Sequence, residues 1–150
     1  MQLTLRQKPC GDSSTAFSAK HIRTVHSQLC LRRLRFAVRL GWTEAERIRP
    51  QPVEIDIALR FPKPPLACLS DELEQTICYD ALTAKVRDLL ERETFKLIEF
   101  MAQSLHELLR KHVEKDTEIW VRVLKIATPV TELHGGVSFA LGDWQPQDFS

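Results

Sequence analysis

Hydrophobic and polar residues alternate along several stretches of the chain, and this alternation is typical of β-strands. The clearest stretch runs from position 53 to position 61, where apolar residues at every second position are separated by Glu54, Asp56, Ala58 and Arg60. Prolines at positions 62, 64 and 65 end the stretch, because proline cannot donate to a strand ladder. We expect a strand with one buried face and one wetter face here.

A second alternating stretch comes earlier and shifts its frame once. Leu29 and Leu31 alternate with polar neighbours, and the apolar positions resume at Leu34 and continue to Leu40. A shift of one residue inside a strand pattern predicts a β-bulge, which we place at Arg32 and Arg33. Residues 41–47 break the alternation, so we expect a loop between these two strands.

The third predicted strand is Glu118–Lys125, and it ends in a charged residue. Alternation puts Ile119, Val121, Val123 and Lys125 on one face. A fourth strand follows the His134-Gly135-Gly136 segment, with its apolar side chains at positions 137, 139 and 141.

Two stretches between the second and third strands have helical spacing. The first carries apolar residues at positions 82, 86, 89 and 90, with Asp80 as its expected N-cap. The second follows Thr94, its expected N-cap, and carries apolar residues at positions 97, 98, 101, 105, 108 and 109. The order ββααββ predicts an α+β fold, a four-stranded antiparallel sheet with two helices on one face.

The length of 150 residues fits one domain of ordinary size. Residues 1–25 are polar and aperiodic, so we expect a poorly ordered N-terminal extension. We place the folded domain at residues 26–144 and a short C-terminal tail at residues 145–150.

Charge and cysteine content exclude several classes of protein. Lys and Arg (21) nearly balance Asp and Glu (20), so no overall field favours nucleic acid or membrane as a partner. No apolar run is long enough to cross a bilayer, and we expect a cytoplasmic location. The four cysteines form no C-x-x-C pair, and His106 and His112 lie six positions apart, so we expect neither a zinc site nor disulfides.

Lys125 and Glu99 have two interpretations each on pattern alone. Lys125 either extends into water at the end of its strand, as lysines often do, or serves as a desolvated base near neutral pH. Glu99 either complements the dipole of the second predicted helix or accepts hydrogen bonds from a ligand.

Four segments, in order, resemble the family of dihydroneopterin aldolase and its relative dihydroneopterin triphosphate epimerase. The resemblance spans residues 27–141. In chain order, the matching segments are Gly41 with Glu46, Gln51 and Asp56; Thr76-Ile77-Cys78-Tyr79; Phe95-Lys96-Leu97-Ile98-Glu99; and Val121-Arg122-Val123-Leu124-Lys125 with Pro129 and Val137.

The resemblance implies the tunnelling fold, in which protomers join edge to edge into a ring-shaped barrel with sites between neighbours. It implies retro-aldol cleavage of 7,8-dihydroneopterin without a cofactor, metal or Schiff base, in a homotetramer or homo-octamer. The implied catalytic residues are Lys125, Tyr79 and Glu46, and the implied pterin-binding residues are Glu99, Ile98 and Tyr79.

Several departures from the family pattern keep other functions open. Arg39 and Leu40 stand where many aldolases carry a histidine-containing segment, and Ile126 stands where proline is usual. Epimerisation at C2′ is therefore the alternative activity, and a catalytically silent pterin-binding protein is a third hypothesis. A nucleic-acid binder that uses Arg32, Arg33, Arg35 and Arg39 ranks last, because the chain as a whole has no excess of basic residues.

Overall fold

The computed structural model describes residues 25–149, in which four strands form one antiparallel sheet in the order β1-β2-β3-β4. The strands are β1 (Ser27–Val38), β2 (Gln51–Phe61), β3 (Glu118–Lys125) and β4 (Val137–Gly142). The long helices are α3 (Tyr79–Arg92) and α4 (Ile98–Arg110), and the short ones are α1 (Glu44–Ile48), α2 (Ala67–Ser70) and the 3₁₀ helix η1 (Leu73–Gln75). The predicted α+β fold is confirmed.

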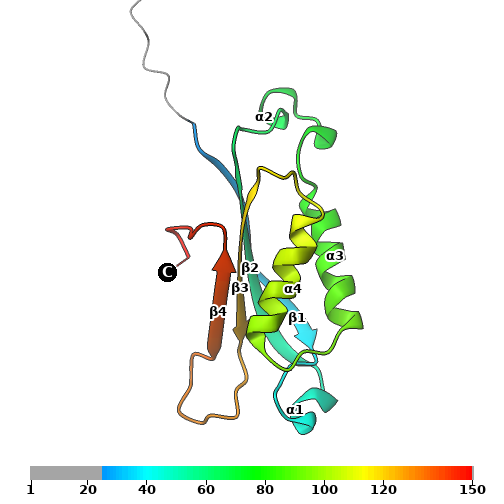
Figure 1. The fold of residues 1–150 in the computed structure, drawn as a ribbon, viewed down its shortest axis with the longest axis vertical. Coiled ribbons are helices and arrows are strands. Elements are labelled where there is room, and N and C mark those ends of the chain that lie inside the picture. Colours follow the sequence, from blue (N-terminus) through cyan, green and yellow to red (C-terminus); the bar gives the residue numbers. More distant parts are fainter. Residues whose placement is uncertain (1–24, 150) are drawn as a thin grey trace, which may run out of the picture.

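Helices α3 and α4 lie on one side of the sheet (Figure 1). Their apolar faces pack against alternate residues of the two central strands, and together they form a single core. The fully buried members of this core include Val53, Ile55, Ile57, Leu59, Val86, Met101, Ala102, Leu105, Leu109, Ile119, Val121 and Val123. Of the helices that the structure describes, none is long and apolar enough to cross a membrane.

The predicted β-bulge lies between Leu31 and Leu34, where the pairing of β1 with β2 shifts. Arg33 adopts a left-handed backbone conformation there, with φ of 55°, and its N–H donates to Asp56 Oδ1 at 2.7 Å. Arg122 holds the other carboxylate oxygen of Asp56 at 2.6 Å. The bulge therefore keeps a partner for its freed N–H.

The expectation that β2 has a wetter face is wrong. Glu54 and Asp56 are buried, as is Ala58, on the side of the sheet away from the helices. Arg35 lies 2.5 Å from Glu54, and Arg122 pairs with Asp56, so the burial of both carboxylates is offset by charge-assisted hydrogen bonds.

The C-terminal segment covers part of this helix-free face. The Phe149 ring contacts Trp120 of β3 with ring centroids 4.7 Å apart, and the guanidinium of Arg32 lies 4.7 Å from the centre of the Phe149 ring. Trp144 makes a similar contact with Arg60. The segment after β4 is thus packed against the sheet, and most of it falls in the predicted tail at residues 145–150.

Three local predictions differ from the structure. Residues 41–47 were expected to form a loop, but they contain the start of helix α1. Cys78, rather than Asp80, caps α3, because its sulfur accepts from Ala81 N. Thr94 does not cap α4, because Phe95 first forms a bridge with Leu40 and the helix begins only at Ile98. The predicted N-terminal extension lies outside the described residues except for its last one.

Candidate active site

The register of the central strands brings the end of β3 to the start of β2. Lys125 pairs with Val53 on one side and with Val137 on the other. Helix α1 immediately precedes β2, so its residues lie beside the last residue of β3. This arrangement places an acid of α1, Glu46, next to the lysine at the end of β3.

Lys125 is buried, and its ammonium donates to a carboxylate. The residue is 8% exposed, and Nζ lies 2.7 Å from Glu46 Oε1. The interpretation in which Lys125 extends into water is therefore wrong. The buried lysine is also not an isolated base, because it forms an ion pair.

The Glu46 carboxylate is held on both of its oxygens. Thr43 N donates to Oε2 at 3.1 Å, and Thr43 Oγ1 lies 3.0 Å from the same oxygen, while Lys125 occupies Oε1. The bond from Lys125, followed by the bond from Thr43 N, lowers the pKa of Glu46 from its usual 4.5 to about 2. The carboxylate is therefore ionised throughout the physiological pH range.

The segment around Glu46 is fixed by side chains that donate to its backbone carbonyls. Gln51 Nε2 donates to the carbonyls of Leu40 and Glu46, and Arg47 donates to the Gly41 carbonyl at 2.7 Å. A side chain at position 41 would put its Cβ 2.3 Å from Glu46 Cβ, so only glycine lets the acid lie this close.

A hollow of about 390 Å³ adjoins the ion pair. It is lined by Glu46, Arg49, Pro50, Gln51, Pro52 and, from the segment after Lys125, Ala127, Thr128 and Pro129. The carboxylate of the pair thus borders a space open to a small molecule.

Glu99 lies at the same end of the sheet, in the first turn of α4. The chain just before α4 is tied to the loop before α1, since Gly41 N donates to Phe95 O at 3.0 Å and Phe95 N donates to Arg39 O at 2.9 Å. Ile98 is half-buried beside it, and Glu99 is exposed. Within residues 25–149 the Glu99 carboxylate accepts no hydrogen bond, so it is available to a ligand.

Tyr79 is not brought together with these residues in one protomer. It is the first residue of α3 and is exposed, whereas α3 runs from there toward the α1 end of the sheet (Figure 1). A helix of 14 residues is about 20 Å long. The described chain therefore separates Tyr79 from Lys125 by about the length of α3.

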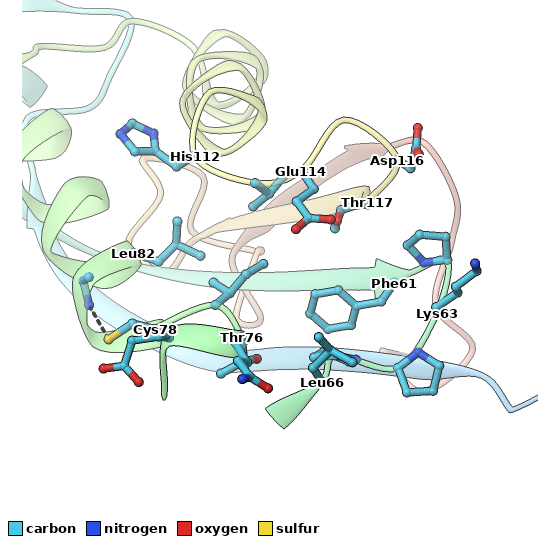
Figure 2. Close-up of a pocket in the computed structure, with 18 of the residues that line it drawn as sticks. Phe61, Lys63, Leu66, Thr76, Cys78, Leu82, His112, Glu114, Asp116 and Thr117 are labelled. Atoms are coloured by element: carbon cyan, nitrogen blue, oxygen red, sulfur yellow. Dashed lines mark hydrogen bonds between the residues drawn. The ribbon is translucent and has the colours of Figure 1, made fainter. Parts of the chain in front are cut away.

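A larger cavity, of about 940 Å³, lies at the Tyr79 end (Figure 2). The segment that precedes Tyr79 lines it through Thr76, Ile77 and Cys78, together with Phe61 and Val113. Because Lys125, Glu46 and Glu99 do not line this cavity, its size alone does not make it the site of the chemistry.

Comparison with known proteins gives the family. A sequence model of FolB dihydroneopterin aldolase matches residues 29–141. The chain is 32% identical over 105 residues to a "probable dihydroneopterin aldolase" of Chlamydia trachomatis, covering 69% of this chain and 85% of that protein. The chain belongs to the dihydroneopterin aldolase family.

Solved structures share the fold of this family member. The dihydroneopterin aldolase of E. coli, in complex with neopterin, matches with a TM-score of 0.68 at 18% identity. The match covers 77% of this chain and 97% of the E. coli chain. The enzyme of Burkholderia thailendensis, bound to guanine, has a TM-score of 0.60 at 21% identity and covers 81% and 93%. The family match ends at residue 141, so the segment packed on Trp120 lies beyond it.

Sequence reasoning missed one member of the site. Thr43 was assigned to a loop, although threonine followed three residues later by glutamate is the signature of a capping box. The structure shows both halves of that box at the start of α1. The same signature would have predicted that Thr43 contacts the Glu46 carboxylate.

Proposed function

We propose that the chain is a dihydroneopterin aldolase, which cleaves 7,8-dihydroneopterin into 6-hydroxymethyl-7,8-dihydropterin and glycolaldehyde. The observation that carries this proposal is the buried ion pair between Lys125 and Glu46. Both residues stand at positions that resemble the family's catalytic segments. The structure holds them 2.7 Å apart, with Glu46 at the edge of a hollow.

The reaction moves protons and breaks one carbon–carbon bond. The C2′ hydroxyl loses its proton as the C1′–C2′ bond breaks, and the electron pair of that bond passes into the C=N of the dihydropterin ring, whose nitrogen takes up a proton. The resulting enol is then protonated at C1′, the ring nitrogen gives up its proton, and the C=N returns. Lys125 and Tyr79 are the proton-transfer pair in this scheme.

The ion pair leaves the Lys125 ammonium able to donate to a substrate as well. An ammonium has three hydrogens, and Glu46 accepts one of them, so two remain for the substrate. Glu46 stays ionised because its pKa is about 2, and it thereby keeps Lys125 in place at neutral pH.

Glu99 recognises the pterin ring. The ring offers its 2-amino group and an adjacent N–H as two parallel donors, and one carboxylate accepts both in a charge-assisted fork. The open carboxylate of Glu99 in the first turn of α4 suits this role, and half-buried Ile98 beside it provides an apolar contact.

Tyr79 reaches this site from a second protomer. Since Tyr79 and Lys125 lie about one helix length apart in a protomer, the Tyr79 end of one copy must abut the Lys125 end of another. Exposed apolar residues at both ends favour such a contact: Trp42, Ile48, Leu97 and Phe100 at one end, and Leu66, Leu69 and Leu73 at the other. β1 and β4 are the edges of the sheet, and edge-to-edge pairing into a ring-shaped homotetramer or homo-octamer would cover them.

The proposed chemistry uses neither a metal nor a Schiff base, because the ring C=N is itself the electron acceptor. Borohydride added during turnover is therefore expected to trap no adduct on Lys125. A mass increase on Lys125 after such treatment would contradict this part of the proposal.

Product analysis tests the activity. The purified protein is incubated with 7,8-dihydroneopterin and, separately, with its triphosphate, and pterin products and glycolaldehyde are quantified. Release of glycolaldehyde with 6-hydroxymethyl-7,8-dihydropterin supports the aldolase. Formation of the 2′-epimer alone would assign the epimerase activity instead, and no change in either substrate would overturn both.

A further inference from the structure

Thr43 contacts one oxygen of the Glu46 carboxylate, and Lys125 contacts the other. Its hydroxyl accepts from Glu46 N at 3.3 Å and lies 3.0 Å from Glu46 Oε2. A hydroxyl has one hydrogen to donate and two lone pairs, so both contacts can exist together. The hydroxyl therefore fixes the backbone and the side chain of the same acid.

The two oxygens of Glu46 have separate partners. Oε2 faces the hydroxyl and the N–H of Thr43, and Oε1 faces Lys125 Nζ. With Oε2 fixed, the carboxylate cannot rotate without breaking a bond to Thr43. Only Oε1 is then presented to the lysine.

We propose that Thr43 is a positioning residue, which sets the place of the Lys125 ammonium through the Glu46 carboxylate. This inference rests on the proposed function, since it gives Lys125 the role described above. It adds that the capping box of α1 serves the proton-transfer site as well as the helix.

The surroundings of the pair support this role. The side chains of Lys125 and Glu46 are 11% and 22% exposed, so water has limited access to replace a lost partner. Glu46 packs directly against the backbone of Gly41, since a Cβ at position 41 would lie 2.3 Å from Glu46 Cβ. A charged acceptor in such a site responds to the loss of one donor more strongly than an exposed one.

A purely structural role for Thr43 makes a different prediction. If Thr43 only caps α1, its loss lowers stability. Any effect on turnover is then the same in the wild-type and Glu46→Gln backgrounds. If Thr43 acts through the carboxylate, its loss has little further effect once that carboxylate is gone. A double-mutant cycle therefore separates the two roles.

The test compares Thr43→Val, Thr43→Ser, Glu46→Gln and the double variant Thr43→Val/Glu46→Gln with the wild type. Valine keeps the shape of threonine but removes the hydroxyl, and serine keeps the hydroxyl. Thr131→Val is the matched control, because Thr131 Oγ1 lies 3.0 Å from Glu132 Oε2 on the surface, in a similar pair that involves no lysine. Glycolaldehyde release gives kcat and KM, and ¹³C NMR of the labelled glutamate carboxyls gives the titration of residue 46.

Thr43→Val is expected to lower kcat about 10-fold, while KM changes less than about 2-fold, since the lost bond orients a charged group. Thr43→Ser restores kcat to within about 2-fold, and Thr131→Val leaves it unchanged. In the Glu46→Gln background, Thr43→Val changes kcat less than about 2-fold. An equal loss in both backgrounds would overturn the proposal.

The NMR titration tests the inference without the reaction. Removing the Thr43 hydroxyl is expected to raise the pKa of Glu46 above its value of about 2. An unchanged titration in Thr43→Val would overturn the positioning role even if the wild type is an aldolase. If the wild type releases no glycolaldehyde, the proposed function fails, and a raised pKa would still show that Thr43 holds the acid that pairs with Lys125.

Discussion

Lys125 and Glu46 are 79 positions apart in the chain, and their side chains meet at 2.7 Å. The contact forms because β3 ends opposite the start of β2, directly after the helix that carries the acid. The ion pair therefore depends on the register of the two central strands. A slip of one residue would turn Lys125 to the other face of the sheet.

The ion pair makes stability depend on pH in a defined window. The pKa of Glu46 is lowered from 4.5 in an unfolded chain to about 2 in the fold. The stabilisation from this carboxylate is therefore complete above pH 4.5 and is lost as the pH falls toward 2. Urea unfolding of the wild type and Glu46→Gln between pH 7 and pH 2 is expected to show a difference that is constant above about pH 5 and shrinks below it. A difference that does not change over this range would contradict the pairing.

Glu99→Gln is expected to weaken pterin binding by about 10-fold or more, because an amide offers one acceptor where the carboxylate offered two. Calorimetric titration with 6-hydroxymethylpterin measures this change. Glu107→Gln is the control, since Glu107 is an exposed acid on α4 about two turns beyond Glu99. Equal affinity for Glu99→Gln and the wild type would exclude Glu99 as the residue that holds the ring.

Much of the fold was predictable because alternation and helical spacing follow directly from burial. β3 was predicted with its observed bounds, and the bulge at Arg33 followed from a single frame shift in β1. The wetter face of β2 was predicted wrongly, because polarity alone does not show that Arg35 and Arg122 pair with its acids.

The candidate site was only partly predictable, because contacts between distant segments decide it. The sequence pattern placed Lys125 on an apolar face, but the pairing with Glu46 depends on the sheet register and on α1. The N-cap of α4 was misplaced for a similar reason. Phe95 is held by its bridge to Leu40, and this tertiary contact delays the start of the helix to Ile98.

A site shared between protomers predicts complementation. Lys125→Ala and Tyr79→Ala are each expected to be inactive alone, since every site lacks one partner. When the two variants are unfolded together and refolded as mixed oligomers, some sites regain both residues and form 6-hydroxymethyl-7,8-dihydropterin. Refolded single variants serve as controls. If the mixed oligomers are as inactive as the single variants, Tyr79 of one protomer does not contribute to the site of another.

The C-terminal segment is expected to stabilise the sheet. Phe149→Ala removes the ring contacts with Trp120 and Arg32 and should lower the free energy of unfolding by about 1–2 kcal/mol. Val25→Ala, at a residue that is 65% exposed and lies just before β1, should change it by less than about 0.5 kcal/mol. Denaturant unfolding at one fixed protein concentration measures both. Equal stability of Phe149→Ala and the wild type would mean that the segment does not contribute.

The rate of glycolaldehyde release by Lys125→Ala tests the proposed mechanism most directly. The wild type is expected to cleave 7,8-dihydroneopterin, and Lys125→Ala should lower kcat by roughly 10²–10⁴-fold, the usual contribution of a group that transfers protons. Binding of 6-hydroxymethyl-7,8-dihydropterin should change far less. Lys111→Ala, at the exposed C-cap of α4, is the control and should retain the full rate. Release of glycolaldehyde by Lys125→Ala at the wild-type rate would contradict the mechanism.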